Sequence, residues 1–184
     1  LYYIRMIEHI PQEILDIYKR LDEANFEAYL VGGCVRNLLL KRKVKDWDMT
    51  TNATPQQILK IFKEGFYDNK FGTVGLPVEA LAKAGVPEKK QIVEITTFRT
   101  EHGFSDRRRP DVVRWGKTIE EDLARRDFTI NSIAVKLSTV NSQLSTGIID
   151  PFKGQQDIIY KIVRAVGNPK QRFNEDVLRL LRAV

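Results

Sequence analysis

Residues 45–51 constrain the fold most, because their sequence KDWDMTT places two acidic side chains in an apolar and β-branched run. If this run forms a strand, alternation points the carboxylates of Asp46 and Asp48 to the same face of the sheet. Two like charges held that close repel each other, and their usual partner is a divalent cation with oxygen ligands. The alternative is an Asx-rich turn that leads into a helix, since the sequence NATP follows.

A glycine pair, Gly32 and Gly33, separates a predicted strand over 26–31 from a predicted helix over 35–40. Strand, glycine turn and helix together form a layout that binds phosphate. Glycine lets the backbone approach an anion, and the N–H groups at the helix start point toward it. Arg36 could add a charge-assisted hydrogen bond. The alternative is a tightly packed turn with Arg36 in solvent.

Apolar spacing, capping residues and breakers predict the remaining elements. The predicted helices cover 11–22, 54–62, 118–125, 154–159 and a stretch that Asn174 caps and that reaches the end of the chain. The predicted strands cover 71–78, 91–99, 144–149 and 161–166, with an insertion over 79–90. Glu94 is then either exposed or a third carboxylate beside the aspartate pair. Residues 102–115 are predicted to form a mobile basic loop, in which Arg107, Arg108 and Arg109 form either solvated surface or a contact for a polyanion.

The composition of the 184 residues is that of a soluble globular protein, with 42% hydrophobic residues and a net charge of +6. A basic excess suits a polyanionic partner without requiring one. The single cysteine, Cys34, excludes an internal disulfide and is expected to be a small buried residue. No apolar run is long enough to span a membrane, and we expect a cytoplasmic protein. Leu1 at the start and a helical pattern up to Val184 lead us to expect part of a longer protein.

Four stretches carry a family resemblance. They are VGGCVRNLLL with DWDMTTNA, then VEITTFRT, then EEDLARRDFTINSIA, and finally IIDPFKG with VGNPKQRFNEDVLRLLRAV. With these motifs in this order, the chain resembles the class II tRNA nucleotidyltransferases, known as CCA-adding enzymes, and the related bacterial poly(A) polymerases. The resemblance implies an α+β fold, a polymerase β-like head with a mixed sheet and helices, over 1–166. It also implies that 167–184 begin an all-α neck, with the body and tail domains absent.

The resemblance implies residue roles as well. Asp46 and Asp48 would be catalytic and would hold two Mg²⁺ ions, one activating the primer 3′-hydroxyl and one steadying the triphosphate. Glu94 would be a third catalytic carboxylate. The implied nucleotide-binding residues are Gly32, Gly33, Arg36, Arg126, Asp127, Asn131, Asp176, Arg179 and Arg182.

The resemblance assigns different residues of this set to the phosphates, the ribose and the base of the nucleotide. Arg126 would meet the phosphates, and Asp127 and Asn131 would lie near the ribose. Asp176 and Arg179 are three residues apart, so on one helix they would share a face and could read the base. Arg182 would continue that face.

The implied function is template-independent addition of CMP and AMP, from CTP and ATP, to the 3′ end of tRNA. Poly(A) polymerase, CC-only and A-only enzymes of the same family remain alternatives, as does a fragment that binds nucleotide without turnover. Small-molecule nucleotidyl transfer shares the paired aspartates but leaves RRDFTIN and NEDVLRLLR unexplained. The chain departs from the family pattern at Asn37, where Asp is usual, and at Ser132, where Ala is common. It also ends before a further arginine that is often present. The oligomeric state stays open.

Overall fold

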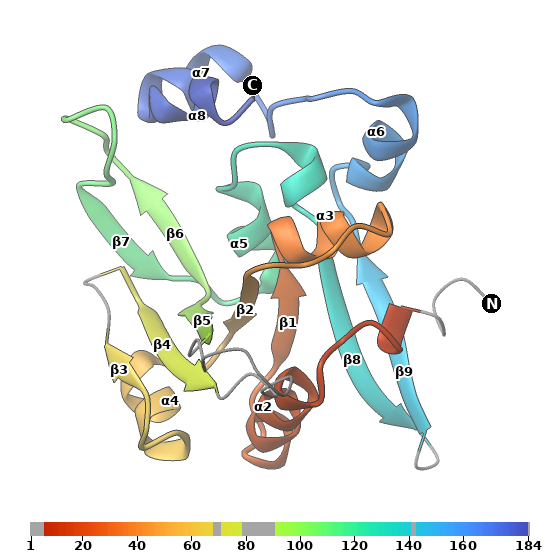
Figure 1. Ribbon diagram of the computed structural model, residues 1–184. Coiled ribbons are helices and arrows are strands. Elements are labelled where there is room, and N and C mark those ends of the chain that lie inside the picture. The colour runs from red at the N-terminus through yellow and green to blue at the C-terminus, as the bar shows by residue number, and fades with distance from the viewer. Residues whose placement is uncertain (1–5, 68–70, 79–90, 141–142, 184) are drawn as a thin grey trace, which may run out of the picture.

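The computed structural model describes residues 6–67, 71–78, 91–140 and 143–183. Seven strands form one sheet in the order β3-β4-β5-β2-β1-β8-β9 (Figure 1). Their bounds are β1 Ala28–Val31, β2 Trp47–Thr51, β3 Phe66–Tyr67, β4 Thr73–Val78, β5 Gln91–Thr97, β8 Ala134–Val140 and β9 Gln143–Ile149. Among these described strands only β2 and β5 pair in parallel, whereas the other neighbouring pairs are antiparallel. The sheet is therefore mixed, which confirms the predicted α+β class.

The helices are α2 Gln12–Glu23, α3 Gly33–Leu39, α4 Pro55–Ile61, α5 Ile119–Ala124, the 3₁₀ turn η1 Thr129–Asn131, α6 Gly154–Tyr160, α7 Pro169–Glu175 and α8 Leu178–Leu181. Helices α2 to α5 divide between the two faces of this sheet, whereas α7 and α8 lie beyond one end of it (Figure 1). The larger core joins α2, α3 and α4 to one face, where Leu30 and Met49 point. The smaller core joins α5 to the opposite face, where Tyr29 and Val31 point. Asp48 alternates with Met49 and so belongs to the face of the smaller core.

Local sequence signals explain most of these boundaries. The Thr54 side chain accepts a hydrogen bond from the backbone N–H of Gln57, and the Gln57 side chain accepts one from the backbone N–H of Thr54. Helix α4 therefore begins with the capping box that its sequence predicts. The side chain of Thr118 caps α5 by accepting a hydrogen bond from the backbone N–H of Glu121. The predicted helices over 11–22, 54–62, 118–125 and 154–159 are confirmed as α2, α4, α5 and α6.

Two predictions for the second half of the chain are wrong. Residues 161–166 form no strand. Ala165 makes a single bridge to Phe128, and the pairing ends there because η1 begins at the residue after Phe128. Residues 102–115 are not all loop, because β6 (Arg99–His102) pairs with β7 (Val112–Trp115) in a separate two-stranded sheet. Only the connection between these strands, which carries the three arginines, is irregular. The predicted insertion over 79–90 lies outside the described residues.

The C-terminal helices also differ from the prediction. Asn168 caps α7 by accepting a hydrogen bond from the backbone N–H of Gln171, and Pro169 follows as the first helical residue. Asn174 therefore lies inside α7 and caps nothing. Within the described ranges, no helix is long and apolar enough to cross a membrane.

Candidate nucleotide and metal site

The glycine turn, the acidic run and the paired arginines meet at one point. β1 ends at Val31, and Gly32 directly precedes α3 as its N-cap with a φ of 74°, a conformation that glycine adopts readily. A Cβ atom built on Gly32 would lie 3.3 Å from Nη1 of Arg126 and 3.5 Å from Oδ2 of Asp48. Three stretches that are far apart in the sequence thus come within contact distance.

The two aspartates lie close together at the start of β2. Asp46 directly precedes the strand and is exposed, whereas Asp48 is its second residue and is half-buried. Burial raises the pKa of Asp48, the charge of Asp46 raises it further, and Arg126 partly opposes both. The carboxylates therefore share an unfavourable electrostatic field, which a bound cation would relieve.

Glu94 occupies the position on β5 that is in register with Asp48. Residues in register on neighbouring strands point to the same face, so the side chains of Asp48 and Glu94 lie on one side of the sheet. Glu94 itself is exposed. Among the described residues, however, no group of three or more His, Cys, Asp or Glu side chains is close enough to hold a metal ion. The pair fits a divalent cation that is held by one or two carboxylates and takes its other ligands from water and substrate phosphates.

Arg126 has hydrogen-bonding capacity to spare. Its Nη2 donates to Oδ2 of Asp122 at 2.8 Å. Its Nε is buried and has no hydrogen-bond partner among the residues that the structure describes. A buried donor without an acceptor is costly, so this guanidinium is suited to an anionic ligand.

A chain of polar contacts connects α3 to η1. Arg36 donates from Nη1 to Oδ1 of Asn131 at 2.6 Å, and Asn131 donates from Nδ2 to Oδ1 of Asp127 at 3.1 Å. Arg36 also donates to the side chain of Asn37 at 3.3 Å, so the residue that departs from the family pattern still contacts it. Oδ2 of Asp127 lies 3.5 Å from Nη1 of Arg182. The predicted phosphate and ribose contacts thus form one connected cluster.

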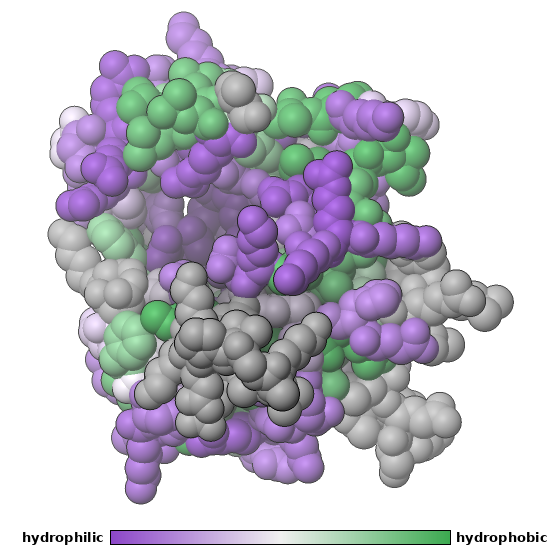
Figure 2. Space-filling model, viewed as in Figure 1, coloured by the Kyte–Doolittle hydropathy of each residue, from purple (hydrophilic) through white to green (hydrophobic). Residues whose placement is uncertain are grey.

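A cavity of about 290 Å³ lies next to this cluster. Arg126, Asp127, Asp176, Arg179 and Arg182 line it, and Arg108 and Arg109 of the β6–β7 connection reach it from the other side. Seven arginines outnumber three carboxylates in its wall, so the cavity favours an anion. Figure 2 shows a recessed hydrophilic surface in this part of the molecule, below α7 and α8 and beside the hairpin of β6 and β7.

The predicted helix that carries Asp176 and Arg179 is wrong in one respect. Asp176 has extended backbone angles, φ −145° and ψ 108°, and separates α7 from α8. Its Oδ1 accepts a hydrogen bond from the backbone N–H of Leu178 at 2.9 Å, a local contact that competes with continuation of the helix. Both side chains are buried and still line the same cavity. Asp176 and Arg179 therefore meet because the chain changes direction at this break, and not because they share a face of one helix.

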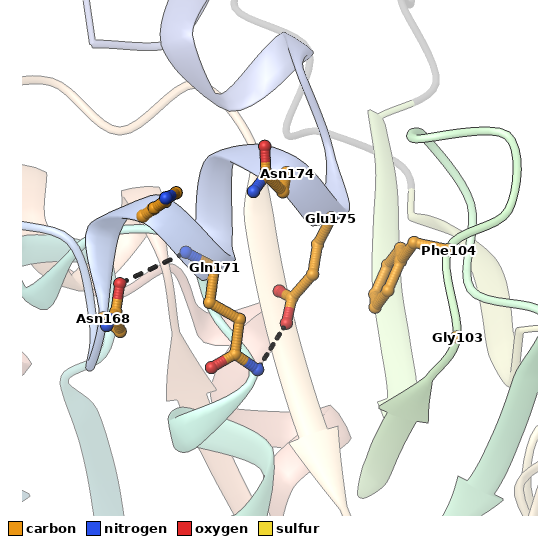
Figure 3. A pocket seen from close by; sticks show the side chains of 7 residues that line it. Gly103, Phe104, Asn168, Gln171, Asn174 and Glu175 are labelled. Carbon is orange, nitrogen blue, oxygen red and sulfur yellow. Dashed lines mark hydrogen bonds between the residues drawn. The ribbon is translucent and has the colours of Figure 1, made fainter.

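A second cavity, of about 550 Å³, lies between α7 and the β6–β7 connection. Figure 3 shows Phe104 facing Glu175 across it, with Gln171 beside them. Gln171 donates from Nε2 to Oε1 of Glu175 at 3.1 Å, so these polar groups satisfy each other. Phe104 lines both cavities, and its ring centroid is 6.0 Å from the Cζ atom of Arg179.

Sequence reasoning missed the carboxylate that holds Arg126. Asp122 is fully buried and is four residues before Arg126 and three before Arg125. This i,i+3 and i,i+4 spacing on a predicted helix was a usable signal. It was obscured because Asp122 is the last of three consecutive acids, two of which are exposed.

The family model described as the poly A polymerase head domain matches residues 28–164. The chain belongs to this family. It is 43% identical to the CCA-adding enzyme of Lactobacillus helveticus over 171 residues, which cover 92% of this chain and 39% of that protein. It is 42% identical to the CCA-adding enzyme of Geobacillus thermodenitrificans over 174 residues, or 94% of this chain and 39% of that protein.

Solved structures of relatives share the fold. The Bacillus stearothermophilus CCA-adding enzyme in complex with CTP superposes with a TM-score of 0.73 at 38% identity, covering 94% of this chain and 37% of that one. The Thermotoga maritima CCA-adding enzyme complexed with tRNA gives a TM-score of 0.70 at 29% identity, covering 98% of this chain and 39% of that one. The present chain thus spans about two-fifths of the length of these relatives.

Proposed function

We propose that this chain belongs to an enzyme that adds CMP and AMP, from CTP and ATP, to the 3′ end of tRNA without a template. One observation carries the proposal: the Asp48 carboxylate and the Arg126 guanidinium both lie against the Gly32 turn. An acidic pair that can hold a cation and an arginine that can hold phosphate are then adjacent, as transfer from a nucleoside triphosphate requires. The relatives named as CCA-adding enzymes, and the solved complexes with CTP and with tRNA, support this assignment.

In this proposal, Asp46 and Asp48 hold Mg²⁺, with Glu94 on the same face as a further carboxylate. When bound, the metal supplies charge neutralisation of the triphosphate and makes the primer 3′-hydroxyl a better nucleophile. Gly32 and Gly33 let the phosphates approach the backbone, and Arg36 and Arg126 contribute positive charge.

The ribose and the base would lie toward the 290 Å³ cavity. Asp127 and Asn131 would meet the ribose, where a 2′-hydroxyl separates ribonucleotides from deoxyribonucleotides. The Asp176 carboxylate would accept a hydrogen bond from the exocyclic amine of cytosine or adenine, and Arg179 and Arg182 would complete that wall. Uracil and guanine carry a carbonyl where that amine would be. A buried carboxylate facing this acceptor could reject them by on the order of 10⁴-fold.

We also propose that residues 1–166 form the catalytic head and that 167–184 begin the neck. CCA addition differs from poly(A), CC-only and A-only addition in the nucleotides that are added. In this proposal the residues named above are common to all four kinds of enzyme. There is a second candidate function. This candidate is a module that binds nucleotide and metal without turning over RNA, and the chain spans about two-fifths of the length of its relatives.

Incorporation of labelled nucleotide tests the two candidates together. The chain is incubated with Mg²⁺, tRNA that lacks its 3′ CCA, and labelled CTP or ATP. Incorporation that disappears in Asp46→Ala and Asp48→Ala, but not in Asp16→Asn on the exposed face of α2, supports the enzyme. CTP binding without incorporation supports the binding module. Neither binding nor incorporation would contradict both.

A further inference from the structure

The carboxylate of Asp122 is buried on α5, and each of its two oxygens has a different task. Oδ1 accepts from Nε and Nη2 of Arg125 at 3.0 and 2.8 Å and from the backbone N–H of Arg99 at 3.4 Å. Oδ2 accepts from Nη2 of Arg126 at 2.8 Å. Both oxygens of this buried charge are therefore paired, and one of them serves Arg126.

Asp122 binds two consecutive arginines, Arg125 and Arg126, whose side chains then reach different parts of the molecule. Arg125 also donates from Nη1 to Oε1 of Glu101 on β6 at 2.9 Å, and the same oxygen accepts from Nε of Arg99 at 2.9 Å. Arg126 instead reaches the glycine turn, where its Nη1 lies beside the position that a side chain on Gly32 would occupy. One buried acid thus connects the hairpin of β6 and β7 to the predicted phosphate site.

We propose that Asp122 is a positioning residue for the nucleoside triphosphate, which fixes the Arg126 guanidinium beside the acidic pair and leaves it able to bind phosphate. The inference rests on the proposed function, because it assigns to Arg126 a phosphate that the protein must bind. One bond to Asp122 anchors Nη2 and leaves Nη1 and the buried Nε for an anion.

The alternative partner for Arg126 explains why an anchor is needed. Nη1 of Arg126 and Oδ2 of Asp48 lie beside the same turn, 3.3 and 3.5 Å from a Cβ atom built on Gly32. Without Asp122, the arginine would be drawn to the acidic pair, where it would occupy the carboxylate that the metal requires. Burial alone would raise the pKa of Asp122, but Arg125 and Arg126 outweigh burial and hold this pKa at about 2. The anchor is therefore ionised throughout the neutral range.

Asp122→Asn tests the inference, because it keeps the shape of the side chain and removes the charge. We expect affinity for CTP, measured by calorimetry with Mg²⁺ present, to fall about tenfold, which is the scale of one charge-assisted hydrogen bond to the phosphate. If the chain turns over, KM for CTP should rise more than kcat falls.

A double-mutant cycle separates positioning from general destabilisation. Once Arg126→Ala has removed the arginine, adding Asp122→Asn should change CTP affinity by less than about twofold. The matched control is Asp157→Asn, since Asp157 is also buried and also pairs with an arginine, Arg164. That variant should lower the melting temperature and leave CTP affinity unchanged.

Two results would overturn the inference. They are wild-type CTP affinity in Asp122→Asn, or an equal loss of affinity whether or not Arg126 is present. Should the Asn variant fail to fold, Asp122→Glu keeps the charge but displaces it by one methylene. Its CTP affinity should fall, and unchanged affinity would count against positioning. If the unaltered chain binds no CTP, the proposed function fails instead, so the two failures are distinguishable.

Discussion

At the residue scale, Asp48 is held at a cost to stability that its function would explain. Its pKa is raised mainly by burial and further by Asp46. A carboxyl whose pKa is higher in the folded than in the unfolded state makes the folded protein less stable as pH rises through that window. The loss is therefore greater at neutral pH than in the acidic range.

Asp48→Asn should therefore stabilise the protein while abolishing nucleotidyl transfer. We expect a gain on the order of 1 kcal/mol in the free energy of unfolding at pH 7, or about 2–4 °C in melting temperature, that shrinks as pH falls toward the acidic range. Mg²⁺ should raise the melting temperature of the wild type but not of the variant. A variant that is less stable than the wild type at neutral pH would contradict this interpretation of Asp48.

Asp176→Ala should relax base choice more than it slows the reaction. The variant leaves the cavity and its arginines in place and removes the carboxylate that would distinguish an amine from a carbonyl. Competition of the four nucleoside triphosphates for incorporation, or for binding if turnover is absent, measures the effect. Unchanged selection among the four would count against base reading by Asp176.

The candidate site was predictable at this scale where a residue type has a distinctive chemistry. Paired aspartates, a glycine pair and consecutive arginines could be picked out in the sequence, and the structure brings Gly32, Asp48 and Arg126 together. The role of Asp122 could not be predicted, because burial and the division of one carboxylate between two arginines depend on tertiary packing.

At the element scale, the turn between β1 and α3 should be sensitive to a single methyl group. Gly32→Ala would strain a backbone conformation that costs non-glycine residues about 1–3 kcal/mol. Its Cβ would also press on Arg126 and Asp48. We expect lower stability together with weaker CTP binding. Gly167→Ala is the matched control, since Gly167 also has a positive φ, of 71°, but its Cβ would meet nothing within 4 Å. That control should lose stability only, and equal loss of CTP affinity in both variants would contradict the explanation.

Elements with strong periodicity and caps were predictable, whereas those decided by tertiary contacts were not. The helix α2 and the capped helix α4 follow from local sequence. Residues 161–166 have the composition of a strand but have no partner strand in the described sheet, so the strand predicted from their composition does not form. The break at Asp176 depends on a side chain that bonds to the backbone two residues on, which apolar spacing does not report. The Asn-Pro pair at 168–169 was the better helix-start signal.

At the scale of the whole molecule, basic side chains surround the candidate site. Arg108 and Arg109 are exposed on the β6–β7 connection and line the 290 Å³ cavity. Arg107 is tied to the C-terminal segment, because its Nη2 donates to Asn174 and its carbonyl oxygen accepts from the backbone N–H of Val177. The hairpin connection is therefore docked beside the cavity and presents two arginines to it.

Arg108→Gln with Arg109→Gln should weaken RNA binding and flatten its salt dependence. For every phosphate that the variant no longer neutralises, the slope of log affinity against log salt should fall by about 0.7–0.9. Lys60→Gln with Lys63→Gln, exposed at and beyond the end of α4, removes the same charge elsewhere and should leave the slope nearly unchanged. Filter binding of tRNA over a range of salt concentrations measures both. Identical slopes for the two double variants would indicate that the arginines are plain solvated surface.

The proposed chemistry depends on a divalent cation between Asp46 and Asp48, beside a triphosphate on the glycine turn. Crystals of the chain grown with CTP and Mn²⁺, a Mg²⁺ substitute with strong anomalous scattering, test this most directly. We expect an anomalous peak bound by both carboxylates, with the triphosphate against Gly32 and within reach of Arg126. Manganese elsewhere, or CTP bound away from this turn with no peak at the aspartates, would contradict it.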